Sequence, residues 1–188
     1  MNLWKPTKEQ IADAKGKTVP DLIGPGMRVL FSGINPSLYS AAVGHHFARP
    51  GNRFWPALHA SGFTPRLLSP FEGRALLDLG CGITNVVDHA TATAAELDPG
   101  ELVEGGRRLE AKVRRAGPKV IAFLGITAYR AAFNLPRATI GPQSGRIAES
   151  RVWVLPNPSG LNAHYQVADL ARLFGTLREA CEGPISDH

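Results

Sequence analysis

The most regular pattern along the chain is a set of short apolar runs, each followed by Gly or Pro. Three of these runs read "MRVLFSG" at residues 27–33, "KVIAFLG" at 119–125 and "RVWVLPNPSG" at 151–160, and a weaker fourth, "ALLDLG", covers 75–80. Their apolar side chains occupy consecutive positions, which is typical of strands that are covered on both faces. We therefore predict four strands of a mainly parallel sheet.

Apolar residues at helical spacing separate these predicted strands. The segments 52–62, 101–117 and 127–133 are predicted helices, and the clearest one, 165–181, repeats apolar residues every three or four positions. Alternating strands and helices predict an α/β fold, a three-layer α/β/α sandwich with a central, mostly parallel sheet. Residues 1–24 are mixed and charged, with a short helix predicted over 8–14. We predict an N-terminal extension, 1–24, followed by a single domain, 25–188.

The composition narrows the class of protein further. A chain of 188 residues carries a net charge of +5, which favours a polyanionic partner such as nucleic acid. Its two cysteines, Cys81 and Cys181, have neither the number nor the spacing for a disulfide framework or a metal site, so we expect no metal and no cofactor. The sequence has no signal-peptide pattern and no membrane-length apolar stretch, so a cytoplasmic protein is expected. We also expect a monomer.

Two of the predicted strands are followed by the same tripeptide, Asn-Pro-Ser, at residues 35–37 and 157–159. Proline biases the preceding residue to an extended conformation, which carries the side chains of Asn35 and Asn157 away from the strand axis. Ligands of parallel sheets bind beyond the carboxyl ends of the strands, so both amides are expected in one crevice. The alternative is that each Asn-Pro pair only ends a strand.

The segments "GINPSLYSAAVGHHFARPGNRFW" at 33–55 and "VLPNPSGLN" at 154–162 resemble the two signature motifs of the mismatch-specific uracil-DNA glycosylases, the Mug/TDG branch of the uracil-DNA glycosylase superfamily. The resemblance covers most of the chain after Gly24. It implies a base-excision-repair enzyme that flips uracil, and related damaged pyrimidines such as ethenocytosine, out of G-mismatched double-stranded DNA. Hydrolysis of the N-glycosidic bond would then leave an abasic site. A non-catalytic nucleic-acid-binding protein on the same scaffold is the alternative.

The resemblance also implies roles for individual residues. Asn35 takes the position that orients the attacking water, and the wedge that fills the place of the flipped nucleotide falls on Leu161, beside Gly160 and Asn162, which would face the orphaned guanine. The positions expected to bind the base are Ile34, Ser40, Phe47 and Asn157. Without the resemblance, Phe47 is more simply a core residue and Leu161 a residue that anchors its loop.

Four further points concern residues in or near these motifs. Asp88 is a second catalytic candidate, because a carboxylate activates water more strongly than an amide, although an Asp at this position also suits a turn. Some members of the family have Lys where this chain has Asn85, so a cationic contribution to the site is lost here. Arg49 and Arg53 are expected on the DNA backbone. Ser37 is small where the uracil-restricted branch has a tyrosine, which predicts a broader substrate range.

Overall fold

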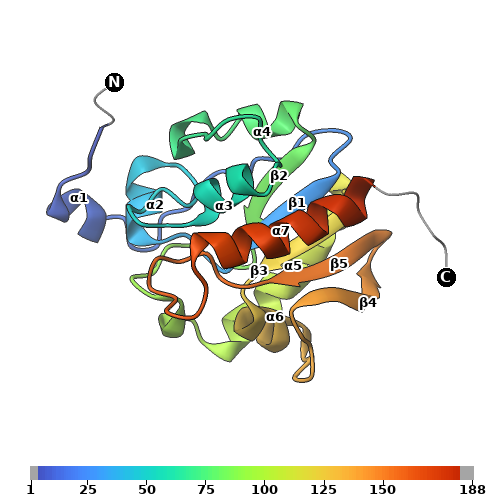
Figure 1. The fold of residues 1–188 in the computed structure, drawn as a ribbon. Helices are drawn as coiled ribbons and strands as arrows, with labels where there is room; N and C mark the ends of the chain where they lie inside the picture. Colours follow the sequence, from blue (N-terminus) through green and yellow to red (C-terminus); the bar gives the residue numbers. More distant parts are fainter. Residues whose placement is uncertain (1–3, 183–188) are drawn as a thin grey trace.

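The structure, a computed structural model, describes residues 4–182, and its centre is a five-stranded sheet (Figure 1). The strands are β1 (Val29–Gly33), β2 (Cys81–Asn85), β3 (Val120–Leu124), β4 (Gly141–Ile147) and β5 (Ser150–Leu155). Their order across the sheet is β2-β1-β3-β5-β4, in which the first four are parallel and β4 runs antiparallel to β5. The predicted mostly parallel sheet is confirmed.

Seven α-helices accompany the described sheet. They are α1 (Lys8–Ala12), α2 (Leu38–Val43), α3 (Phe54–Ala60), α4 (Ala75–Asp78), α5 (Pro99–Ala116), α6 (Ile126–Phe133) and α7 (Val167–Glu182). Two short 3-10 helices, η1 (Pro70–Glu72) and η2 (Ala94–Glu96), lie in the connections. Within residues 4–182, no helix combines the length and the apolar character that crossing a membrane requires.

Side chains alternate between the two faces of each strand and produce two separate apolar cores. Phe31 faces the core made with α3, α4 and α7, whereas its neighbour Leu30 faces the core made with α5 and α6. Strands that are covered on both faces read as continuous apolar runs, which explains the pattern in the sequence. Figure 1 shows α7 lying across the sheet with α3 beside it. The three-layer α/β/α sandwich is therefore confirmed.

The predicted strand at 75–80 is wrong. Residues 75–78 form α4, and Gly80, at a φ of 69°, turns the chain into the true strand, Cys81–Asn85. That strand is completely buried although it contains Gly82, Thr84 and Asn85, so its low hydrophobicity concealed it. The sequence analysis also missed the edge strand β4 and the short helix α2. Strand β4 has few apolar residues, and α2, with six residues, is too short to show a helical period.

The segment before β1, residues 14–22, packs against the domain. Ala14 and Val19 are buried, and Leu22 forms an antiparallel bridge with Ile83 of β2. Two backbone hydrogen bonds join this segment to the loop after β2, from Gly16 N to Ala90 O and from Ala90 N to Lys17 O. Residues 14–22 thus form a strap along the edge of the sheet.

Candidate active site

A cavity of about 390 Å³ lies beyond the carboxyl ends of β1, β2, β3 and β5. Three strand-exit loops, after β1, β2 and β5, supply most of its lining, as expected for a parallel sheet. Ten residues that the sequence analysis singled out line it: Ile34, Asn35, Ser37, Ser40, Phe47, Arg49, Asn85, Asn157, Leu161 and Asn162. Gly160 and Asp88 are not among the lining residues.

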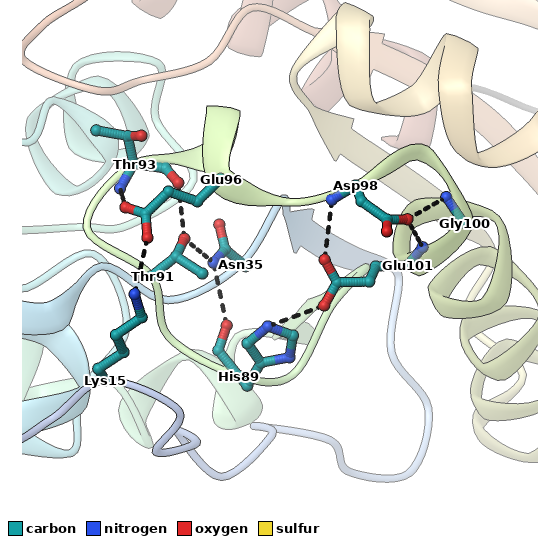
Figure 2. A network of polar contacts seen from close by, with 9 residues as sticks. All are labelled: Lys15, Asn35, His89, Thr91, Thr93, Glu96, Asp98, Gly100 and Glu101. Carbon is teal, nitrogen blue, oxygen red and sulfur yellow. Dashed lines mark hydrogen bonds and ion pairs between the residues drawn. The ribbon is translucent and has the colours of Figure 1, made fainter.

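Asn35 presents its side-chain oxygen without a protein partner. Its Nδ2 donates to the backbone oxygen of His89, at 3.0 Å, and to Oγ1 of Thr91, at 2.8 Å (Figure 2). These two bonds use both hydrogens of the amide. Among residues 4–182 nothing donates to Asn35 Oδ1, so this oxygen is left as an acceptor at the cavity.

Asn157 presents the opposite half of its amide. Its Oδ1 accepts from the backbone N–H of Ser159, at 3.0 Å, in a turn closed by the side chain. Its Nδ2 has no partner within the described part of the chain and is therefore a donor at the cavity. The two Asn-Pro-Ser loops thus offer the cavity one hydrogen-bond acceptor and one donor.

Asn85 is the residue that sequence reasoning undervalued. It ends β2 directly opposite Gly33 and is only 4% exposed, yet its amide makes no hydrogen bond to residues 4–182. None of the fully buried side-chain nitrogen or oxygen atoms in that range lacks a partner, so the amide of Asn85 must be reached from the cavity that it lines. The signal available in the sequence was the family resemblance, in which some members have a lysine at this position.

Gly33 leaves the room that these side chains need. A Cβ at this position would lie 2.5 Å from Oδ1 of Asn85 and 3.3 Å from the ring of Phe47. Only glycine lets the backbone of β1 approach both groups so closely.

Phe47 forms a flat apolar wall of the cavity. Its ring stacks on Phe54, with centroids 4.2 Å apart and planes 29° from parallel, so one face is covered by protein. Its backbone has a φ of 53°, in the left-handed region that a bulky residue rarely adopts. Backbone strain of this kind is concentrated at functional sites.

His46 is a buried, uncharged neighbour of this wall. Its Nε2 lies 2.9 Å from the carbonyl oxygen of Pro20, which can only accept, so Nε2 carries the hydrogen. Burial lowers the pKa of His46, against the opposing effects of the Pro20 hydrogen bond and the charge of Asp21. The imidazole is therefore neutral at neutral pH.

Asp88 is engaged outside the cavity. Its Oδ1 lies 2.7 Å from Nζ of Lys112, whose other partner is Asp21 of the strap, at 3.0 Å. Burial lowers the pKa of Lys112, but the hydrogen bonds and charges of Asp88 and Asp21 raise it by more, so the ammonium stays charged. The structure ties this carboxylate to a structural cluster and does not bring it to Asn35.

Leu161 lies on an irregular loop, residues 156–166, and the residue is 70% exposed. The loop is nevertheless well bonded, because Asn162 Nδ2 donates to the backbone oxygen of Asn157 and Leu161 N donates to Ser159 Oγ. Gly160 is pressed against the first motif, where a Cβ would lie 2.5 Å from Gly51 O. A large apolar side chain thus stands in solvent on an ordered loop.

The two arginines of the first motif have different surroundings. Arg49 is exposed at the cavity and remains a candidate for phosphate contact. The guanidinium of Arg53, which we also expected on DNA, instead donates to carbonyl oxygens of the Leu161 loop.

No group of three or more side chains that could hold a metal ion occurs among residues 4–182.

The sequence matches the family described as "Uracil DNA glycosylase superfamily" over residues 20–178. The fold is similar to a solution structure from Methanosarcina acetivorans, a protein described provisionally as a uracil DNA glycosylase. The TM-score is 0.58 at 18% sequence identity, over 87% of this chain and 98% of that one. The family match covers the sheet, the cavity and both Asn-Pro-Ser loops, so this chain belongs to the uracil DNA glycosylase superfamily.

Proposed function

We propose that the protein is a monofunctional DNA glycosylase of the mismatch-specific Mug/TDG type. It removes uracil opposite guanine from double-stranded DNA and leaves an abasic site. Membership of the superfamily supports DNA glycosylase activity in general. The finer proposal rests mainly on the side-chain amide of Asn35. Both of its hydrogens are donated to protein oxygen atoms, whereas its own oxygen has no protein partner and lies at the cavity.

The chemistry needs an oriented water rather than a strong base. When the bond between the sugar C1′ and the base N1 breaks, its electron pair leaves with the base, and positive charge develops on the sugar. Oδ1 of Asn35 accepts a hydrogen bond from water and aims the water oxygen at C1′, where the new bond forms. The amide does not take up the proton, which passes to solvent or to the departing base.

The leaving base is stabilised by donors. Nδ2 of Asn157 has no protein partner and suits a carbonyl oxygen of uracil, on which negative charge grows as the bond breaks. Asn85, with both an N–H₂ group and an oxygen free, matches the neighbouring N–H and carbonyl groups on the edge of uracil. Phe47 provides the stacking surface.

Water is the nucleophile because no amine is at hand. Among the cavity-lining residues that the structure describes there is no lysine, and the partly buried Lys112 is held by Asp21 and Asp88. An enzyme that cleaves the strand as well needs an amine to form a covalent imine with the sugar. We therefore propose that the protein leaves the DNA strand intact.

Access to a paired base requires flipping, and the exposed Leu161 is a suitable wedge beside the cavity. The small residues Ser37 and Ser40 line the same cavity, which leaves room for groups attached to the base. The substrate range then extends to five-substituted uracils and ethenocytosine opposite guanine.

The proposal is tested with labelled duplexes that carry uracil, thymine or ethenocytosine opposite each of the four bases. One portion of each sample contains borohydride during the incubation with the protein. Of the remainder, one half is treated with alkali afterwards and the other half is left untreated. We expect alkali-dependent breaks, fastest for uracil opposite guanine, and no trapped protein–DNA adduct. DNA binding without any breaks would instead identify a non-catalytic binder on this scaffold, and an adduct would contradict the water mechanism.

A further inference from the structure

Arg53 joins the two halves of the site. It lies immediately before α3, where Asn52 Oδ1 accepts from Phe54 N, and its side chain reaches the loop 156–166 more than a hundred positions later in the sequence. Its Nη1 lies within hydrogen-bond distance of three carbonyl oxygens, those of Ser159 (3.2 Å), Asn162 (2.7 Å) and Tyr165 (2.9 Å). Nη2 approaches a fourth, that of Gly160, at 3.4 Å.

These carbonyl groups have a physical need for such a donor. The loop has no helix or strand to pair its backbone, and an unpaired carbonyl in a partly buried loop costs free energy. The four oxygens surround one planar guanidinium, which offers several N–H groups in a fixed arrangement. The backbone of Arg53 adds a further bond, from its N–H to Pro158 O at 2.8 Å.

The arrangement centres on the residue proposed to enter the DNA. Ser159, Gly160 and Asn162 surround Leu161 in sequence, so Arg53 contacts the backbone on both sides of it while the leucine side chain remains exposed. A wedge must push between stacked bases, and a loop that is already ordered loses less conformational entropy when it does so. Ordering of this loop therefore favours insertion.

We propose that Arg53 is a positioning residue for DNA opening: it holds the loop around Leu161 in the shape that inserts into the duplex. This inference rests on the proposed glycosylase function. It assigns Arg53 no contact with the base or the water. Its loss should therefore impair excision from duplex DNA, where bases must be unstacked, much more than excision from single strands, where no duplex has to be opened.

The test compares two variants of Arg53. Arg53→Gln removes both the positive charge and the planar set of N–H groups, and Arg53→Lys keeps only the charge. Single-turnover uracil excision is measured on a duplex with uracil opposite guanine and on the same strand alone. Arg107→Gln, at an exposed arginine of α5, serves as the control for losing one positive charge. Leu161→Ala is the reference for losing the wedge, and the double variant completes the cycle.

We expect both Arg53 variants to lower the duplex rate about tenfold or more while the single-strand rate changes about twofold or less. The double variant with Leu161→Ala should be no slower on duplex than Leu161→Ala alone, since both changes prevent the same step, the insertion of Leu161 into the duplex. Parallel losses on the two DNA forms, or effects of Arg53 and Leu161 that multiply, would overturn the inference. A wild-type protein inert toward both DNA forms would overturn the proposed function itself, and this role with it.

Discussion

The hydroxyl of Thr91 fixes the orientation of the Asn35 amide. Thr91 Oγ1 gives its single hydrogen to the carbonyl oxygen of Thr93, at 2.8 Å, so toward Asn35 it can only accept, and Nδ2 of Asn35 lies 2.8 Å away (Figure 2). The backbone oxygen of His89 receives the second amide hydrogen. The side-chain oxygen of Asn35 is thereby the free acceptor, which is the polarity that holding a water requires.

Asn85→Ala should slow the excision of uracil. The substitution removes the unpartnered amide at the end of β2 and with it the hydrogen bonds to the edge of the base, worth about 1–3 kcal/mol, or roughly 5- to 150-fold in rate. Single-turnover kinetics on duplex DNA with uracil opposite guanine measure the loss. Asn134→Gly, at the left-handed end of α6 and outside the cavity, is the control and should keep the rate. An unchanged rate in Asn85→Ala would show that this residue does not form hydrogen bonds with the base.

Ser37→Tyr should narrow the substrate range while sparing uracil. The added ring fills space at the cavity beside the base, so ethenocytosine and five-substituted uracils should lose more rate than uracil does. Ser37 also caps α2, because its Oγ accepts from Ser40 N at 3.1 Å, and loss of such a cap costs about 1 kcal/mol. Ser37→Ala removes the cap without adding bulk and separates the two effects. Equal losses for all bases would mean that another residue sets the range.

Asp88→Asn should leave the excision rate nearly unchanged. The carboxylate lies outside the cavity on Lys112, which keeps Asp21 as a second partner, and the Asp88 side chain is 43% exposed. We expect a loss of stability of about 1 kcal/mol or less, measured by urea unfolding, since the Asp88 carboxylate is partly exposed and the amide of Asn can still accept from Lys112. A large fall in rate would instead make Asp88 the group that activates water.

Acidification should destabilise the protein partly through His46. Burial lowers its pKa in the folded state, so as the pH falls below about 6.5 the unfolded chain binds a proton that the folded chain resists. The contribution is therefore present above this pH and is lost as the pH falls toward the folded-state pKa. His46→Gln should show a flatter decline between about pH 7 and 5 than the wild type in urea unfolding. His45, whose pKa burial also lowers, is less buried than His46, so His45→Gln should have the smaller effect. Identical slopes for wild type and His46→Gln would contradict this explanation.

The sequence predicted those features that depend on local pattern. Strands covered on both faces gave continuous apolar runs, and proline after Asn35 and Asn157 placed both amides at one end of the sheet. Features that depend on distant contacts were not predictable. Strand β2 is buried despite its polar residues because the strap and β1 cover it, and Asp88 is held by Lys112, 24 positions away. The opposite polarity of the two amides, and the use of Arg53 on loop carbonyls, also follow from tertiary contacts alone.

The central claim, that Asn35 positions the water that hydrolyses the glycosidic bond, is tested most directly by the release of free uracil. Wild type and Asn35→Ala are incubated in excess over a duplex with uracil opposite guanine, and free base is quantified by mass spectrometry over time. We predict that Asn35→Ala binds the duplex nearly as well as wild type but releases uracil at least an order of magnitude more slowly, a loss on the order of 2 kcal/mol or greater. Release at the wild-type rate by Asn35→Ala would contradict the claim and reduce Asn35 to a structural residue of its loop.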